Sequence, residues 1–265
     1  KIFLKTQKHI QKIDKMILAP RIIARLDIKG ENVVKGINLE GVRPVGKPEI
    51  LAKKYYIQGI DEIIYMDVVA SLYERNSLVK YIKEAAKNIF VPLTVGGGIR
   101  NLDDIKEVLN NGADKVAINT AAIKNPGLIK QASEMIGSQS IILSIEAKKQ
   151  KDNSWEAYFN NGREKSGINV IDWIEEAEKL GAGEVLLTSV DNEGLKRGMD
   201  IKLLDCIKNK VKIPVIFCGG VGNVQHIKEA IKGVDAIAIA SILHYEKITV
   251  NEIKNILKIK NHEFC

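Results

Sequence analysis

A glycine turn that occurs twice constrains the fold of this chain more than any other feature. The segment PLTVGGGIR (92–100) runs from an apolar strand pattern into three glycines, and the helix-like NLDDIKEVLNNG (101–112) follows. About half a chain later, IPVIFCGGVG (213–222) repeats this order. Glycine has no Cβ atom, so its backbone can turn sharply and bring N–H groups close to an anion. We therefore expect a duplicated scaffold that holds one ligand by two phosphate groups, although tight turns without a ligand are the alternative.

Apolar, β-branched runs of strand length alternate with helix-period segments along the chain. The strand-like runs are 21–28, 62–69, 90–95, 114–119, 140–146, 184–190, 213–217 and 235–240. The main helical segments are 48–59, 77–88, 101–112, 169–181, 201–210, 226–233 and 250–259. Strands that are nearly continuous in apolar residues are typical of a parallel sheet covered on both faces. The pattern predicts one (β/α)8 barrel domain over residues 16–265, with a doubly wound open sheet as the alternative.

The duplication extends beyond the glycines. GIDEIIYMD (59–67) matches GAGEVLLTS (181–189), and LDIKG (26–30) matches IEAKK (145–149), at nearly the same offset. Such self-similarity indicates two half-barrels of four β/α units each. Corresponding sites are then expected to lie opposite each other on one face of the barrel.

Charge is concentrated at the start of the chain. The net charge is +7, but residues 1–15 alone carry five lysines and one aspartate. The remainder is only mildly basic, which favours an anionic small molecule over a nucleic acid as the ligand. We expect residues 1–15 to be an extension outside the core fold, ahead of a start at Met16. A transit segment is the alternative, although the stretch lacks arginine and serine.

Several classes of protein are not indicated. No apolar run approaches the roughly 18 residues that a membrane-spanning helix needs. The three cysteines have no short-range pairing, which favours a reducing, cytoplasmic compartment over a disulfide framework or a zinc site; they are Cys206, Cys218 and Cys265. The four histidines lack metal-ligand spacing; they are His9, His226, His244 and His262. We expect no metal and no cofactor.

Two acidic residues stand at the ends of equivalent strands. Asp27 ends the first strand-like run and Glu146 the fifth, and they are counterparts in the repeat. In a barrel the C-terminal strand ends form the active site, so these carboxylates are expected to face each other across the mouth. Opposed carboxylates suit general acid–base catalysis. They can equally bond backbone N–H groups or pair with lysines, and spacing leaves both readings open; the lysines are Lys29, Lys35 and Lys148.

The remaining polar strand ends complete the predicted ligand site. One strand after each glycine turn stands a residue whose hydroxyl can donate to phosphate, Thr120 or Ser241. The predicted phosphate-binding residues are Gly97, Gly98, Asn119 and Thr120 in the first half, and Gly219, Gly220, Ala240 and Ser241 in the second. Asp67 and Asp191 are expected to shape loops or bind substrate hydroxyls.

Four charged residues begin strands at the opposite end of the barrel; they are Arg21, Glu62, Lys115 and Glu184. Two positive and two negative side chains can form a neutral ring that closes the barrel floor. Solvated strand ends are the alternative.

Together these stretches resemble the cyclase subunit of imidazole glycerol phosphate synthase, a (β/α)8 barrel of histidine biosynthesis. The resemblance covers nearly the whole chain from about Met16 onward. The stretches that carry it are RIIARLDIKGENVVKG, DEIIYMDVVAS, PLTVGGGIR, GADKVAINTAA, LGAGEVLLTSVDNEG, IPVIFCGG and ASILHY.

The resemblance implies roles for particular residues. Asp27 would be a general acid or base with Glu146 at the partner position, and Gly194 would join the second phosphate site. The four charged floor residues would gate ammonia supplied by a glutamine amidotransferase subunit docked on the N-terminal face. Ammonia attack, cleavage and ring closure would convert phosphoribulosyl-formimino-aminoimidazole-carboxamide ribotide, a bis-phosphorylated substrate, to imidazole glycerol phosphate and aminoimidazole-carboxamide ribotide.

The chain departs from the family pattern at the predicted mouth. Glu146 replaces an aspartate, and Arg25 replaces a cysteine two residues before Asp27, on the same strand face. Glu193 and Leu195 replace an aspartate and a threonine near the second phosphate. Arg25 is expected to point into the barrel and favour ionised Asp27, which hinders a general-acid role.

These departures leave two rivals to the cyclase. The first is a paralogue that only delivers ammonia with an amidotransferase for another pathway, such as surface-sugar amidation. The second is the related single-chain sugar isomerase, which has no need of the floor ring.

Overall fold

A closed barrel of eight parallel strands forms the centre of the molecule. The computed structural model describes residues 19–70, 78–208 and 210–259, so the basic segment 1–15 lies outside the described residues. The barrel strands are β1 (Arg21–Lys29), β4 (Glu62–Asp67), β5 (Leu93–Gly96), β6 (Lys115–Ile118), β7 (Ile141–Lys149), β10 (Glu184–Ser189), β11 (Val215–Cys218) and β12 (Ala236–Ile239). Pairing of β10 with β7 closes the ring, so the (β/α)8 prediction is confirmed and the open-sheet alternative is wrong.

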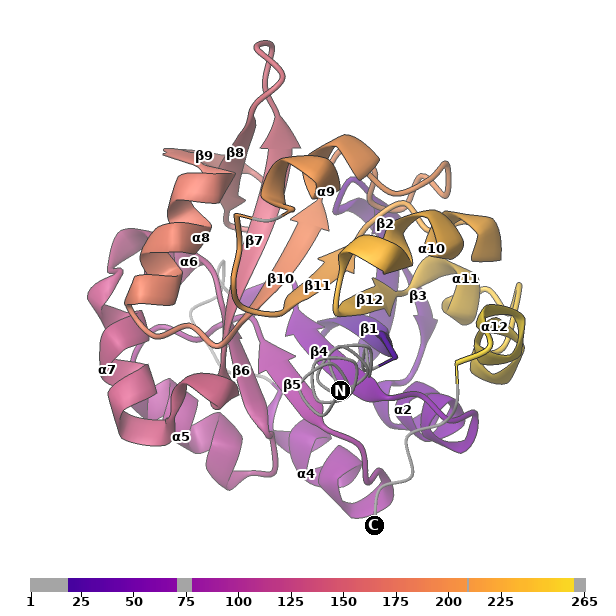
Figure 1. Cartoon of the computed structure of the whole chain (residues 1–265). Coiled ribbons are helices and arrows are strands. Elements are labelled where there is room, and N and C mark those ends of the chain that lie inside the picture. The colour runs from indigo at the N-terminus through magenta and orange to yellow at the C-terminus, as the bar shows by residue number, and fades with distance from the viewer. Residues whose placement is uncertain (1–18, 71–77, 209, 260–265) are drawn as a thin grey trace, which may run out of the picture.

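Helices surround the barrel on its outer side (Figure 1). They are α2 (Pro48–Ile57), α4 (Val79–Asn88), α5 (Leu102–Asn110), α6 (Thr120–Lys124), α7 (Gly127–Ile136), α8 (Val170–Lys179), α9 (Ile201–Ile207), α10 (Val224–Ala230), α11 (Ser241–His244) and α12 (Val250–Leu257), with short 3-10 turns at Ser138–Ser140 and Ile231–Gly233. Polar N-terminal caps fix where several of these helices begin. Asn101 accepts from two backbone N–H groups of α5, and Thr249 forms a capping box with Glu252 at α12.

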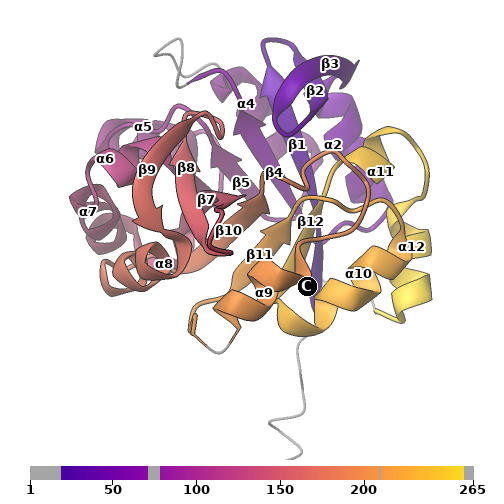
Figure 2. The same cartoon turned by 90° about the horizontal axis from the view of Figure 1, so that it is seen from above.

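Two antiparallel hairpins, which the sequence patterns did not predict, extend the barrel strands above the mouth. Strands β2 (Asn32–Ile37) and β3 (Glu40–Gly46) follow β1, and β8 (Trp155–Phe159) and β9 (Glu164–Asn169) follow β7. Each hairpin therefore follows the first strand of one half of the chain. Figure 2, which looks down on this end, shows the hairpins on either side of the mouth.

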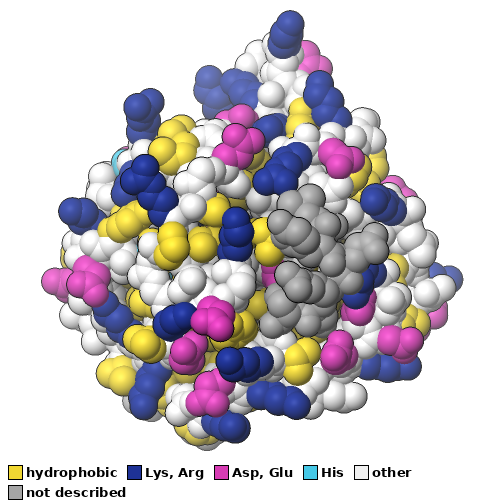
Figure 3. Space-filling view, turned by 180° about the vertical axis from the view of Figure 1, so that it is seen from behind, with side chains coloured by type: hydrophobic (Ala, Val, Ile, Leu, Met, Phe, Trp, Pro, Cys, Tyr) yellow, Lys and Arg dark blue, Asp and Glu magenta, His cyan; other side chains and the backbone are white. Residues whose placement is uncertain are grey.

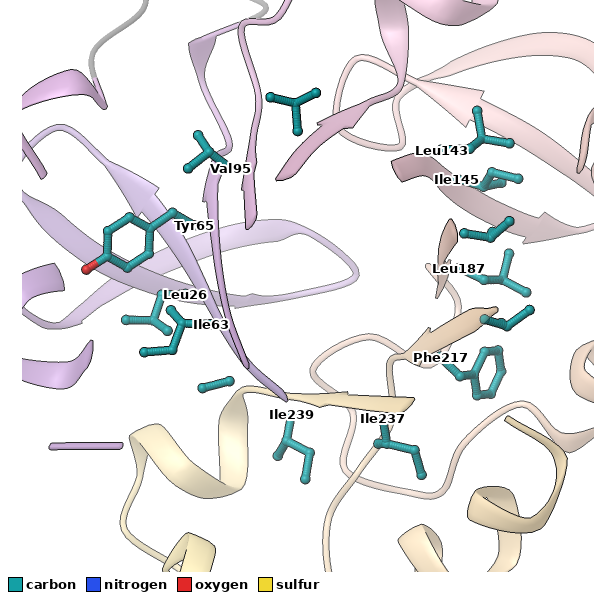
Figure 4. Close-up of a cluster of buried hydrophobic side chains, with 14 of the residues drawn as sticks. Leu26, Ile63, Tyr65, Val95, Leu143, Ile145, Leu187, Phe217, Ile237 and Ile239 are labelled. Atoms are coloured by element: carbon teal, nitrogen blue, oxygen red, sulfur yellow. The ribbon is translucent and has the colours of Figure 1, made fainter. Parts of the chain in front are cut away.

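Alternating side chains of each strand build two separate hydrophobic layers. Outward-pointing residues pack against the helices, and Figure 4 shows those of the strands, including Leu26, Tyr65, Leu187 and Phe217, directed away from the barrel axis. A smaller cluster fills the interior; it comprises Ile23, Ile64, Ala117, Ile142, Leu186, Ile216, Cys218, Ala236 and Ala238. The interior is thus a packed core, as barrels of this type require.

The surface of the side seen from behind is mixed in charge. On the side shown in Figure 3, basic and acidic side chains are interspersed with single hydrophobic ones. Within residues 19–70, 78–208 and 210–259, no helix has the length and apolar character needed to cross a membrane.

Candidate active site

A cavity of about 310 Å³ opens beside the first glycine turn. Gly97 and Gly98 have φ of +85° and +75°, a region that L side chains rarely adopt. A Cβ atom on Gly97 would lie 2.1 Å from the carbonyl oxygen of Asp67, so only glycine allows β4 and β5 to approach here. Six of the predicted site residues line the cavity: Asp67, Gly97, Gly98, Asn119, Thr120 and Glu146.

Glu146 reaches this cavity from the end of β7 and is held by two donors. Asn119 Nδ2 donates to Glu146 Oε2 at 2.9 Å, and the backbone N–H of Gly162 donates to the same oxygen at 2.7 Å. Burial raises the pKa of Glu146 to about 7, against the opposing effects of these hydrogen bonds and of Arg25. Glu146 can therefore hold a proton near neutral pH.

The neighbouring polar groups of the cavity are oriented by the β8–β9 hairpin. Thr120 Oγ1 accepts from the backbone N–H of Asn160 at 3.2 Å. Asn119 also donates from Nδ2 to the carbonyl oxygen of Tyr158 at 3.2 Å. Its buried Oδ1 atom has no hydrogen-bond partner among the residues described. Because a buried acceptor without a partner is costly, this oxygen is suited to accept from a ligand.

Asp27 lies in a different environment, clamped between two buried cations. Arg25 Nε donates to Asp27 Oδ1 at 2.8 Å, and Lys35 Nζ lies 3.6 Å from Asp27 Oδ2. Burial alone would raise the pKa of Asp27, but Arg25 and Lys35 together lower it below its usual value. Asp27 is therefore ionised.

Arg25 crosses the barrel interior, as strand alternation predicts. It is only 2% exposed, and its Nη1 donates to Thr188 Oγ1 of β10 at 2.8 Å. The same nitrogen lies 3.7 Å from Cys218 Sγ of β11. The guanidinium thus ties β1 to the opposite wall, between the apolar interior layer and the mouth.

The predicted residues of the second phosphate site also come together, but they enclose almost no space. They surround a cavity of only about 10 Å³, lined by Gly194, Gly219, Gly220, Ala240 and Ser241 together with Glu193 and Cys218. Glu193 is buried and forms an ion pair with Lys35. The two glycine turns, although equivalent in sequence, therefore differ in the space that they offer.

Asp67 and Asp191 bond the backbone of mouth loops. Asp67 Oδ1 accepts from the N–H groups of Val69 and Ala70 at 3.0 and 2.9 Å. Asp191 Oδ2 accepts from the N–H of Lys149 at 2.8 Å. Both contacts fit the expected loop-shaping role, and Asp67 additionally lines the first cavity.

The charged residues of the floor form a closed ring. Arg21 pairs with Glu62 at 2.7 Å and with Glu184. Lys115 pairs with the same two carboxylates, at 3.2 Å and 2.9 Å. Thr94 Oγ1 also donates to Glu62 Oε1 at 2.7 Å. The alternative of separately solvated strand ends is therefore wrong.

The sequence interpretation missed the turn that holds Glu146. Asn160, Asn161 and Gly162 have successive φ values of +51°, +60° and +72°. An Asn-Gly pair between strand-like runs is a strong hairpin signal, so this turn was open to prediction. Other lining residues that were not predicted are Arg100, Lys124, Asn125 and Ser144.

Across the three described ranges, no group of three or more His, Cys, Asp or Glu side chains could hold a metal ion. His244 is buried, with Nδ1 2.8 Å from the hydroxyl of Tyr55 and Nε2 3.1 Å from the carbonyl oxygen of Arg25. These bonds fit a structural role. His9, His262 and Cys265 lie outside the described residues.

Comparison with known proteins gives consistent matches along the chain. A family model described as "Histidine biosynthesis protein" matches residues 21–249. "Imidazole glycerol phosphate synthase subunit HisF" of Legionella pneumophila is 55% identical over 205 residues, 77% of this chain and 97% of the relative. The protein of that name from Thermococcus onnurineus is 47% identical over 245 residues, 92% of this chain and 97% of the relative. That from Pyrococcus furiosus is 46% identical over 242 residues, 91% and 96% of the two chains.

Proposed function

The chain belongs to the histidine biosynthesis protein family, and from this membership we infer that it is the cyclase subunit of imidazole glycerol phosphate synthase. The observation that carries this function is the agreement in sequence over nearly the full length of the relatives. The reaction is the ammonia-dependent closure of an imidazole ring at the barrel mouth. Its substrate is phosphoribulosyl-formimino-aminoimidazole-carboxamide ribotide.

We propose Asp27 and Glu146 as the acid–base pair, with separate roles. When two carboxyl groups of one site have pKa values pushed apart, their environments assign the acid and the base. Asp27 is ionised beside Arg25 and Lys35, which suits a base or a stabiliser of developing positive charge. The raised pKa of Glu146 lets it deliver a proton near neutral pH.

The first glycine turn is the proposed site for one substrate phosphate. Its support is the open cavity, the positive φ of Gly97 and Gly98, and the hydroxyl of Thr120. Backbone N–H groups and hydroxyls are common phosphate donors, and Lys124 and Arg100 add positive charge at the same cavity. The second phosphate is assigned to Gly194, Gly219, Gly220, Ala240 and Ser241.

The floor ring is the proposed entry for ammonia, with a glutamine amidotransferase subunit docked on the N-terminal face. The relatives are named as subunits, which fits a partner of this kind. The ring closes the barrel on the face opposite the mouth, so ammonia produced there would enter through it.

The direct test supplies an ammonium salt and the ribotide to the purified chain and follows release of both products. The cyclase function predicts turnover without the partner. Glu146→Asp and Arg25→Cys each restore a family residue, so turnover by a variant where the wild type has none would identify that residue as the obstacle. Absence of turnover in all three proteins would refute the cyclase function.

Two observations favour a second candidate, a subunit that delivers ammonia to another enzyme without closing a ring. Both oxygens of Asp27 face buried cations, and the second phosphate site has almost no free volume. A delivery subunit needs neither a catalytic Asp27 nor a second phosphate site. It would stimulate glutamine hydrolysis by its partner and release free ammonia, yet leave the ribotide unchanged in the assay above.

A further inference from the structure

The carboxylate of Glu193 lies beside the second glycine turn. A Cβ atom built on Gly219 would be only 3.5 Å from Glu193 Oε2, and the same oxygen lies 4.0 Å from Cys218 Sγ. Glu193 lines the small cavity that Gly219, Gly220 and Ser241 enclose. A carboxylate therefore already lies next to the turn, in the small space that the turn encloses.

This position of Glu193 is fixed from several sides. Its carboxylate pairs with Lys35, which is buried on β2, and both side chains are under 5% exposed. Its backbone carbonyl accepts from the N–H of Asn38 at 2.8 Å. The next residue, Gly194, packs so closely on β2 that a Cβ atom there would lie 2.2 Å from the carbonyl oxygen of Gly36.

At the first glycine turn, the described residues place no carboxylate in a comparable position. The cavity there measures about 310 Å³, against about 10 Å³ at the second turn. The space free beside Glu193 is therefore far smaller than the space at the first turn. Asp67, at the end of β4 beside the first turn, is bonded instead to the N–H groups of its own loop.

We infer that Glu193 is a resident anion of the second glycine turn, so the unliganded chain offers one phosphate site rather than two. A second phosphate can enter only by displacing the Glu193 carboxylate from Lys35, and Lys35 then becomes its counter-ion. Charge balance supports the exchange. Lys35 pairs with two anions, Asp27 and Glu193, and the phosphate would replace Glu193 as the second of them. This deepens the proposed function, on which it rests for the ligand's second phosphate.

The test is a titration with inorganic phosphate at constant ionic strength, followed through backbone amide resonances. In the wild type, we expect saturable shifts for Gly97, Gly98 and Thr120 and none for Gly219, Gly220 and Ser241. In Glu193→Ala, both sets of amides shift with phosphate. Glu193→Asp, which withdraws the carboxylate by one methylene, serves if Glu193→Ala does not fold.

The matched control is Glu229→Ala, which removes the same charge from α10, the helix that follows the second turn. It is expected to titrate like the wild type. Saturable shifts at Gly219 and Gly220 in the wild type would overturn the inference, as would their absence in a folded Glu193 variant. Because binding is measured without turnover, a chain that lacks cyclase activity still gives a result. If only the amides of the first turn failed to shift, the result would count against the proposed function and not against the inference on Glu193.

Discussion

At the scale of single residues, the two halves of the barrel place acids at equivalent positions but give them different electrostatic surroundings. Asp27 is surrounded by the cations of Arg25 and Lys35, whereas Glu146 is bonded to the neutral donors of Asn119 and Gly162. The repeat in sequence predicted where both acids lie. Their pKa shifts are opposite because burial raises the pKa of Glu146, whereas Arg25 and Lys35 lower that of Asp27.

Glu146→Gln is expected to change how stability depends on pH. The folded pKa of Glu146, about 7, lies above its ordinary value of 4.5, so the unfolded chain loses this proton first as pH rises. The wild type therefore loses stability between about pH 4.5 and 7, and Gln, which has no proton to lose, does not. Urea denaturation across this range should show the variant equal to the wild type at the acid end and relatively more stable above pH 7. Parallel curves would contradict the raised pKa.

Arg25→Ala is expected to destabilise the fold by about 3 kcal/mol, because it removes one partner of a buried ion pair. Thr188→Val is the matched control, since it removes another hydrogen bond of Arg25 without disturbing charge, and should cost about 1 kcal/mol. Chemical denaturation at neutral pH gives both values. A smaller loss for Arg25→Ala than for Thr188→Val would show that the clamp on Asp27 contributes little.

At the scale of elements, the two hairpins position the mouth. The β8–β9 turn supplies the N–H that holds Glu146, and Asn161 Nδ2 of this turn donates to the carbonyl oxygen of Leu39 in the β2–β3 turn at 3.3 Å. β2 in turn carries Lys35 to Asp27. Each acid therefore depends on the hairpin that follows its own strand.

Gly162→Ala and Gly167→Ala form a matched pair on the β8–β9 hairpin. Both glycines have positive φ, +72° and +77°, so each alanine should cost about 1 kcal/mol of stability. A Cβ atom on Gly162 would lie 3.2 Å from Leu39 Cδ1, while one on Gly167 meets nothing within 4 Å. Only Gly162→Ala should therefore weaken the hydrogen bond from the backbone N–H of residue 162 to Glu146, and so raise the pKa of Glu146 further.

The carboxyl carbon resonance of Glu146 reports this pKa directly. Its midpoint should move to higher pH in Gly162→Ala and stay near the wild-type value in Gly167→Ala. Equal midpoints in both variants would mean that the Gly162 N–H does not control the proton on Glu146.

The barrel strands were predictable from sequence because strands buried on both faces read as apolar runs; β1 was expected at 21–28 and is Arg21–Lys29. The hairpins were missed because they are short and partly exposed. Strand β3 contains Pro44 and Gly41 and alternates poorly, although the Asn-Asn-Gly turn of the other hairpin gave a usable signal. The position of Glu193 beside the second glycine turn depends on how β2 packs on a distant loop, which no local pattern encodes.

At the scale of the whole molecule, the barrel interior is a stack of layers from floor to mouth. The charged ring comes first, the apolar layer around Ile64 and Leu186 second, and the Arg25 clamp third. In the proposed route, ammonia made at the floor would cross all three before it met a substrate at Glu146. A neutral NH₃ molecule can pass an apolar layer without the cost of burying a charge. It would pass the charged ring only where the ion pairs of the ring separate.

Lys115→Met tests whether the floor ring is part of this route. The variant leaves Glu62 and Glu184 with Arg21 as their only remaining cation in the ring, so the ring is expected to distort. With the amidotransferase partner and glutamine, turnover should fall about tenfold, a barrier change of about 1.4 kcal/mol. With a saturating ammonium salt, which bypasses the partner by reaching the substrate from the mouth, turnover should stay near the wild-type rate. Lys130→Met, on the exposed surface of α7, should leave both rates unchanged. An equal loss with both nitrogen sources would place the effect of Lys115 on the fold and not on the entry of ammonia.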